Sequence, residues 1–152
     1  MKKYQKILIV IGIVIVAFVA ATIFIFSWEG SPKKIVEAAD QFQPPSSWKL
    51  TAESIKSPRL SCWDGGGCPH VNRGWLYNDL LTYDDLEARL KQTDWQYTFD
   101  DRCQTMDQPK EDETSFFCVV DITSEDYNGN IYIGNSEQQD YRYRFALFLG
   151  PR

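Results

Sequence analysis

Residues Ile7 to Phe26 form an uninterrupted run of twenty residues that contains no charged side chain, Asn, Gln or Pro. As a helix with a rise of about 1.5 Å per residue, this run is roughly 30 Å long, which matches the hydrocarbon thickness of a bilayer. A helix satisfies all of its own backbone hydrogen bonds, as lipid requires. The run is therefore expected to be a membrane span or a secretion signal.

The length of the run favours an uncleaved anchor over a cleaved signal. The apolar stretch of a signal peptide is about 7–15 residues long and ends at a small-residue cleavage site. Here the only suitable small pair, Val19 and Ala21, lies inside the run, and the apolar-leaning residues 22–26 follow it. We therefore expect a transmembrane helix over residues 7–26 that interacts with the lipid bilayer.

The orientation of this helix follows from the flanking charges and, more strongly, from the cysteines. Three lysines precede the run and two follow it closely, which gives only a modest preference for a cytoplasmic N-terminus. All four cysteines lie after the run, and disulfides persist mainly outside the cytoplasm. The sequence thus predicts a single-pass protein with a cytoplasmic tail over residues 1–6 and an extracytoplasmic C-terminal domain.

The exported portion is one acidic domain. All 21 Asp and Glu lie after residue 26, and with the 13 Lys and Arg found there they leave a net charge of −8. An acidic domain without a basic stripe is a poor match for phosphate backbones. We expect no nucleic-acid partner.

A short helix is expected directly after the anchor. Ser31 and Pro32 form an N-terminal signal, and apolar residues then recur at helical spacing up to Phe42. The pair Pro44-Pro45 ends the pattern. We interpret residues 27–46 as a juxtamembrane stalk, with a partner-binding helix as the alternative.

The remaining residues, 47–152, alternate apolar and polar side chains in several short segments. This alternation predicts strands, and the segments are 48–52, 59–62, 69–78, 95–99, 116–122, 131–133 and 141–149. Asn128-Gly129 is the strongest turn signal, because this pair readily adopts the positive φ angles of a type I′ turn. We expect a hairpin turn at this pair.

One helix is expected inside the domain. Thr82 is its predicted N-cap, with Asp85 in the position of the capping-box acid. Leu86 and Leu90 lie one turn apart and would face a sheet, and the pattern ends by Thr93. The predicted fold class is therefore α+β: an N-terminal transmembrane helix, then a small disulfide-stapled antiparallel sheet with one packed helix.

The cysteine spacing favours two local disulfides. Cys62 and Cys68 bracket a triple glycine, and Cys103 and Cys118 bracket a polar loop between two strands expected to be neighbours. The pairing 62–68 with 103–118 is favoured, and the two other pairings stay open. Zinc-binding and thioredoxin-like sites are disfavoured because no C-x-x-C spacing is present.

Catalytic and metal-binding signals are weak. His70 is the only histidine and no G-x-S-x-G motif accompanies it. Five residues resemble an EF-hand loop, but isoleucine occupies the position that requires glycine; they are Asp126, Asn128, Asn130, Tyr132 and Glu137. We therefore expect no catalytic residue, no metal site and no cofactor.

Aromatic residues near the triple glycine form the one recognition patch that the sequence offers. These are Trp63, Trp75 and Tyr77; core packing is the favoured role at this spacing, and Trp63 is the best candidate for exposure. We expect a non-enzymatic binding or assembly module that docks onto a protein partner of the cell envelope. A small-ligand or glycan sensor is the alternative, and an envelope hydrolase using His70 or a carboxylate pair is disfavoured.

Overall fold

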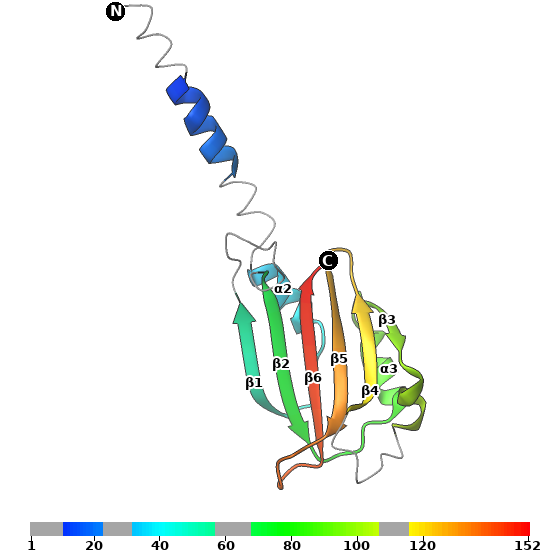
Figure 1. Ribbon diagram of the computed structural model, residues 1–152. Coiled ribbons are helices and arrows are strands. Elements are labelled where there is room, and N and C mark those ends of the chain that lie inside the picture. The colour runs from blue at the N-terminus through cyan, green and yellow to red at the C-terminus, as the bar shows by residue number, and fades with distance from the viewer. Residues whose placement is uncertain (1–10, 23–31, 57–67, 107–115) are drawn as a thin grey trace, which may run out of the picture.

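The computed structural model describes residues 11–22, 32–56, 68–106 and 116–152. After a helix over residues 11–22, these residues form nine elements (Figure 1). The elements are α2 (Pro32–Asp40), β1 (Lys49–Lys56), β2 (His70–Tyr77), α3 (Tyr83–Leu90), β3 (Gln96–Phe99), the 3-10 helix η1 (Asp101–Thr105), β4 (Phe116–Thr123), β5 (Tyr127–Asn135) and β6 (Tyr143–Pro151).

The strands form one six-stranded sheet in the order β1-β2-β6-β5-β4-β3, and every neighbouring pair is antiparallel. Strands β3 to β6 follow one another as a meander. β1 and β2 form a hairpin that joins this meander through the pairing of β2 with β6. The predicted α+β class and antiparallel sheet are confirmed, and the predicted neighbours on either side of the 103–118 loop, β3 and β4, are indeed paired.

The helices α2 and α3 pack on the same face of the sheet (Figure 1). Their buried side chains belong to one core cluster with the inward-facing residues of the strands. Phe42, which follows α2, stacks on Phe145 of β6 at 4.8 Å between ring centroids. A second stack joins Trp48 to Tyr77 at 4.3 Å. The rings of Phe42, Trp48, Trp75, Tyr77 and Phe145 thus form one aromatic cluster within the core.

Helix α3 has the predicted cap. The backbone N–H of Asp85 donates to the Thr82 hydroxyl at 3.2 Å, and that hydroxyl donates to the Asp85 carboxylate at 2.8 Å. Leu86 and Leu90 are both fully buried against the sheet. This helix therefore forms where local capping and the apolar pattern agree.

Helix α2 also forms, but it is part of the folded domain. Ile35, Ala39 and Phe42 are almost completely buried in the core. Asp40 of the same helix forms an ion pair with Arg73 of β2 at 2.6 Å. The predicted stalk over residues 27–46 therefore differs from what is seen from Pro32 onward, because the apolar side of the helix is covered by the sheet.

The expected turn at Asn128-Gly129 is wrong. Both residues lie inside β5, and the connection from β4 is made by residues 124–126, where the Ser124 N–H donates to the Tyr127 carbonyl at 2.7 Å. Gly129 pairs with Ile122 on one side and Leu149 on the other. A Cβ at this position would overlap the backbone carbonyl of Phe148. This glycine therefore permits a close approach of two strands.

The helix over residues 11–22 exposes its apolar side chains, including Val16 and Phe18 at 68% and 71%. Across the described ranges, no helix combines the length and the apolar character needed to cross a membrane. Residues 7–10 and 23–26 of the predicted span lie outside those ranges. The transmembrane helix stays a prediction.

Replacing Gly129 by Ala should destabilise the domain by about 1–3 kcal/mol, because the new methyl group forces β5 and β6 apart. Gly150→Ala is the matched control in β6, since a Cβ there would lie 3.8 Å from the Phe148 ring, at ordinary contact distance. It should change stability by less than about 1 kcal/mol. Urea unfolding measures both variants, and equal effects would contradict the close-approach assignment.

Candidate functional site

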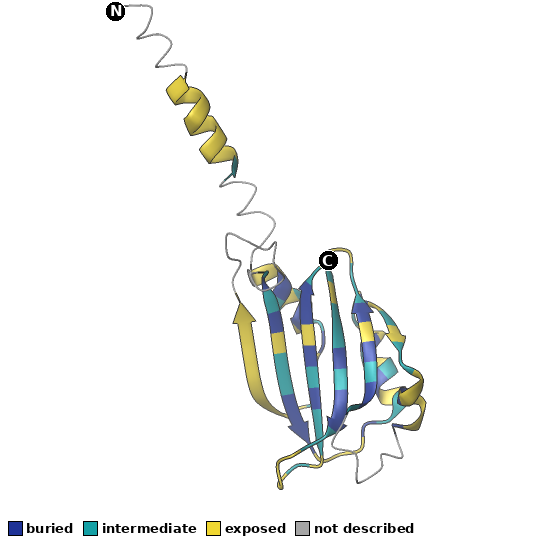
Figure 2. Ribbon diagram, in the orientation of Figure 1, coloured by how far each residue is buried: buried dark blue, intermediate teal, exposed yellow. Residues whose placement is uncertain are grey.

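The face of the sheet opposite the two helices is not covered by any described element (Figure 2). We call it the outer face. Its side chains alternate along each strand with the buried residues of the core, as the pleat requires. We refer to β2, β6 and β5 as the three central strands. On these strands the outer face consists of His70, Asn72, Gly74, Leu76, Asn128, Asn130, Tyr132, Gly134, Arg144, Ala146, Phe148 and Gly150.

Phe148 lies at the centre of one row across this face. The register pairs it with Asn72 of β2 on one side and with Asn130 of β5 on the other. The row continues to Ser54 on β1 and to Asp121 on β4. These five residues are called the Phe148 row. Neighbouring strands are about 4.8 Å apart, so Asn72 and Asn130 lie roughly 10 Å from each other with the backbone of Phe148 between them.

The Phe148 side chain is 39% exposed, and it is the one large hydrophobic side chain of the described outer face that is classed as exposed. Its ring extends along β6 toward Gly150, since its Cε1 atom lies 3.8 Å from where a Cβ on that glycine would be. The His70 ring lies 5.5 Å away at an angle of 38°. The ring of Phe148 is therefore supported at its edge and accessible from solvent.

The polar groups beside Phe148 differ in how they are engaged. The Asn130 amide donates to the Asp121 carboxylate. For Asn72, the described part of the chain provides no hydrogen-bond partner for the side-chain amide, which is exposed. One side of the ring thus carries an amide oriented by a neighbour, and the other carries an amide available to solvent.

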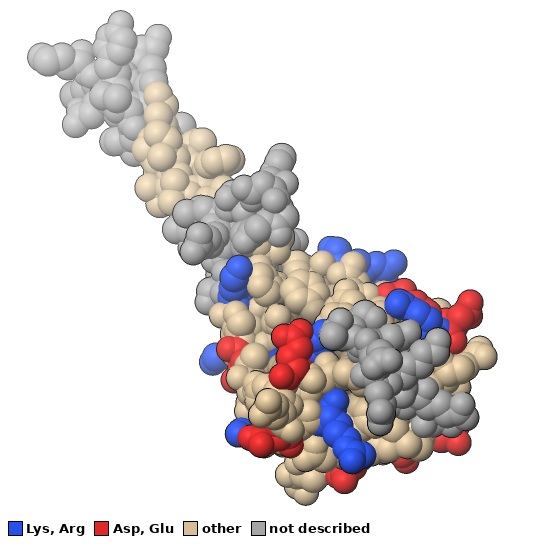
Figure 3. All heavy atoms as spheres, turned by 60° about the horizontal axis from the view of Figure 1, so that its bottom comes forward, with Lys and Arg blue, Asp and Glu red and all other residues tan. Residues whose placement is uncertain are grey.

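Charge is almost absent from the centre of the outer face. On the three central strands, the one Lys, Arg, Asp or Glu among the outer-face residues is Arg144. Its guanidinium lies 3.7 Å from the Glu137 carboxylate and 4.4 Å from the centroid of the Phe116 ring. Elsewhere the domain mixes both signs, as the end of the domain seen in Figure 3 shows.

The row beside the Phe148 row is nearly flat. It contains Gly74 and Ala146, which have no side-chain atom beyond Cβ, and Ala52 lies next to Gly74 on β1. Tyr132 follows on β5, where its ring centroid is 5.1 Å from that of Phe116. The centre of the outer face is therefore a shallow surface between two aromatic positions.

A groove of about 380 Å³ lies on the opposite, helix-covered face, where α2 leaves β1 uncovered. It is lined by Asp40, Phe42, Gln43, Pro44, Leu50, Glu53, Arg73 and Trp75. Arg73 bridges α2 and β1, at 2.6 Å from the Asp40 carboxylate and 2.8 Å from the Glu53 carboxylate. The charged groups of the groove therefore hold the fold together.

Strand β1 is an edge strand of the described sheet, and all of its residues are exposed. Lysines occupy both of its ends, Glu53 points toward the helix-covered face, and the register shifts between Leu50 and Ala52. Terminal lysines, an inward charge and a bulge are features that prevent pairing with another strand. The edge of β1 is thus a protected edge.

The predicted recognition patch does not lie together on the surface. Trp75 and Tyr77 are 5% and 2% exposed and belong to the core, because they fall on the inward phase of β2. Burial raises the pKa of the Tyr77 hydroxyl well above its usual value. Trp63 lies outside the described residues.

Phe148 is not among the residues predicted from the sequence to form a site. The pattern of β6 nevertheless points to it, because Phe145, Leu147 and Leu149 alternate along the buried face and Phe148 is a large apolar residue on the opposite face.

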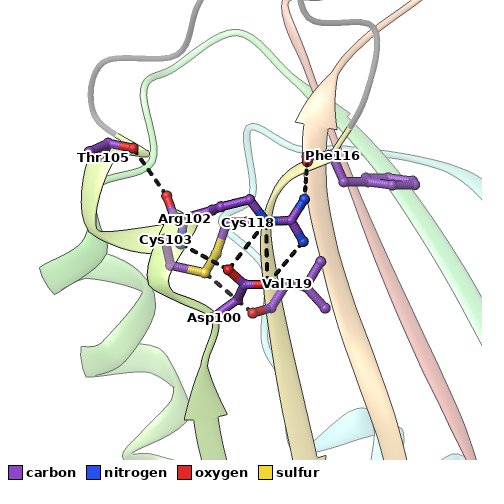
Figure 4. Close-up of a disulfide and its surroundings, with 7 residues drawn as sticks. All are labelled: Asp100, Arg102, Cys103, Thr105, Phe116, Cys118 and Val119. Carbon is purple, nitrogen blue, oxygen red and sulfur yellow. Dashed lines mark hydrogen bonds and ion pairs between the residues drawn. A yellow bond between two sulfur atoms is a disulfide. The ribbon is translucent and has the colours of Figure 1, made fainter.

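The disulfide between Cys103 and Cys118 is confirmed, with 4.4 Å between the Cα atoms (Figure 4). It joins η1 to β4, and both cysteines are fully buried. The predicted partner of Cys68, Cys62, lies outside the described residues.

Asp100 caps η1 next to this disulfide. Its carboxylate accepts hydrogen bonds from the Arg102 side chain at 2.9 Å and from the Arg102 backbone N–H at 2.9 Å (Figure 4). These side-chain and then backbone hydrogen bonds lower the pKa of Asp100 from its usual value. The ionised carboxylate therefore helps to hold the short helix at the disulfide.

The residues considered for catalysis or metal binding do not form a common site in the described part of the chain. The Nδ1 atom of His70 lies 3.2 Å from the carbonyl oxygen of Cys68, at the start of β2. The EF-hand-like residues 128–132 lie on an extended strand instead of a loop. Within the described ranges, no group of three or more His, Cys, Asp or Glu could hold a metal ion.

Comparison with known proteins gives no match to a family model, to a curated protein or to a solved structure.

Replacing Asp100 by Asn should reduce the acid sensitivity of the fold. Because the folded pKa is lowered, the stabilisation is present above the unfolded value of about 3.9 and is lost as the pH falls through the folded pKa. Asn remains a good N-cap, so the substitution removes mainly the charge. Thermal melting from pH 7 to pH 2 should show a smaller loss for Asp100→Asn than for the wild type.

The exposed neighbour Asp101 provides the control for this measurement. Its side chain makes no hydrogen bond or ion pair to the described part of the chain. Asp101→Asn should therefore retain the wild-type pH dependence. Identical curves for the wild type and Asp100→Asn would contradict the role of the Asp100 charge.

Proposed function

We propose that this protein is a membrane-anchored, extracytoplasmic binding module of the cell envelope, without enzymatic activity. The observation that carries the proposal is the outer face: the helices cover one side of the sheet, and the other side presents an exposed ring between two amides. Amphipathic sheets usually leave polar side chains on the solvated face. An aromatic ring at the centre of such a face is a reason to assign binding to it.

The anchor is supported by the exposed apolar side chains of residues 11–22. In water these apolar side chains would stay exposed to solvent, which is unfavourable, whereas a bilayer would bury them. The proposed span over residues 7–26 ends shortly before α2. Five residues reach at most about 18 Å when extended, so the domain would lie close to the membrane surface.

The extracytoplasmic location is supported by the Cys103–Cys118 disulfide, and residues 1–6 would then lie in the cytoplasm. A binding role is supported over hydrolysis by the spacing of the titratable groups on the outer face. His70 on β2 and Asp121 on β4 are separated by the width of three strand spacings, about 14 Å. That distance is too long for a hydrogen-bonded acid–base pair.

The ligand of the module would be an envelope component that contacts the outer face. An envelope protein is the partner expected from the sequence, and a glycan or another small ligand is the alternative. Both classes would approach the same surface, since the charged groups of the groove on the other face already pair with one another through Arg73.

Mass spectrometry of the membrane-extracted protein tests the anchor. We expect the intact mass of the chain with residues 7–26 retained, in a fraction that alkaline carbonate does not release. The physical reason is that a run of this length is stable only in the bilayer once inserted. A mature N-terminus near Thr22, or release by carbonate, would contradict the anchor.

Photo-crosslinking in intact cells tests the binding surface. A photoreactive amino acid at Asn72 should capture an envelope component, because this side chain is exposed within the Phe148 row. The matched control is Ala88, which is exposed on α3 on the opposite side of the sheet. Adducts at Ala88 that equal those at Asn72, or no adducts at Asn72, would argue against the outer face.

A further inference from the structure

We infer that the outer face binds an uncharged carbohydrate chain, with one sugar ring stacked on Phe148 and its hydroxyl groups bound by Asn72 and Asn130. The inference rests on the proposed binding function and names the ligand of the same face. It follows from three properties of the outer face: an accessible aromatic ring, amides at a defined spacing, and few charges, since the one carboxylate of the Phe148 row, Asp121, already accepts a hydrogen bond from Asn130.

The first property is the ring. A pyranose presents C–H groups on its two faces and hydroxyl groups around its edge. The face of an aromatic ring carries partial negative charge and attracts such polarised C–H groups. Phe148 is 39% exposed and leans along β6 toward Gly150. One side of its ring is therefore available to a sugar lying on the sheet.

The second property is the spacing of the amides. Asn72 and Asn130 flank Phe148 on adjacent strands, about 4.8 Å to either side. A pyranose ring is about as wide as one strand spacing, so a sugar that overlaps the Phe148 ring from the side of Asn72 and Asn130 can direct its edge hydroxyls toward both amides. Each Asn side chain both donates and accepts hydrogen bonds, as does each hydroxyl.

The orientation of one amide is already determined. Asn130 donates to Asp121, which directs its carbonyl oxygen and remaining N–H away from that carboxylate. An oriented amide loses less conformational freedom on binding than a free one. Asn72 is exposed, so it can adapt to the hydroxyl pattern of the sugar. The row thus combines one pre-oriented and one adaptable polar contact.

The third property is charge. The exported domain carries a net charge of −8, whereas the three central strands of the outer face carry one charged outer side chain, Arg144, which is ion-paired with Glu137. An acidic domain repels anionic polymers at long range. The two residues paired with Phe148 carry amides, and the nearest carboxylate of the row, Asp121, lies two strands away from Phe148. The charge distribution therefore fits an uncharged ligand.

The shape of the face fits a chain better than a single sugar. Gly74 and Ala146 leave the next row flat, and Tyr132 stands at its far side. A second sugar could lie over the flat row without a steric obstacle and reach the Tyr132 ring. A protein partner is less well matched, since Phe148 is the one exposed large hydrophobic side chain that the described outer face offers to an interface core.

Ligand-observed NMR on the full chain in lipid nanodiscs tests this inference. The probes are three neutral tetrasaccharides, chitotetraose, cellotetraose and maltotetraose, with anionic tetragalacturonate for comparison. We expect at least one neutral probe to bind and the anionic probe not to bind. Nanodiscs are used because maltoside detergents contain a sugar head group.

The variants assign the binding to Phe148. Phe148→Ala should lower the affinity about tenfold or more, whereas Phe148→Trp should retain it because a larger ring keeps the stacking surface. Ile55→Ala is the matched control, since Ile55 is exposed on the helix-covered face of β1. It should bind like the wild type, and circular dichroism of each variant establishes that the fold is retained.

Two results would overturn the inference: no binding of any neutral probe, or binding that Phe148→Ala leaves unchanged. The photo-crosslinks at Asn72 then show whether only the carbohydrate ligand is wrong or whether the proposed binding function is wrong as well. A captured envelope protein without sugar binding would retain the binding module and reject the carbohydrate. The absence of both sugar binding and crosslinks would reject the two together.

Discussion

The pairing of β2 with β6 is the interaction on which the rest of this structure depends. It joins the β1–β2 hairpin to the β3–β6 meander, and Trp75 of the first lies opposite Phe145 of the second. Phe42 stacks on Phe145 from the side of α2, so the same pairing also seats that helix. Because both helices then cover one face, the opposite face is left to solvent with its own set of side chains. The candidate site is therefore a consequence of both helices packing on the same face of the sheet.

The parts of this fold that depend on local chemistry could be predicted from the sequence. Thr82 and Asp85 form a cap within four residues of chain, and Leu86 and Leu90 follow from helical spacing. The alternation of apolar residues identified the strands, and the Cys103–Cys118 bond follows from a loop between two adjacent strands. In each case the interacting groups are close in sequence, so the pattern alone carries the information.

The parts of the fold that depend on contacts between distant segments could not be predicted from the sequence. Gly129 was interpreted as a turn residue because Asn-Gly favours turns, but its role is set by the carbonyl of Phe148, a residue on another strand. Helix α2 was interpreted as part of a stalk because it follows the predicted membrane helix directly, but its apolar side is covered by the sheet. For Trp75 and Tyr77 the spacing favoured core packing but left a recognition role open, and the phase of β2 places both residues in the core. Phe148 became a candidate only when the register set it between two asparagines.

The position of β6 also determines when the domain can fold. This strand is the last that the structure describes, yet it lies between β2 and β5 in the interior of the sheet. A chain that emerges from the ribosome or from a translocation channel with its N-terminus first therefore exposes β1 to β5 before their shared neighbour arrives. The hairpin has no meander to join during that interval, and the rings under α2 have no Phe145 to cover them. Folding of this domain is consequently a late event of its synthesis.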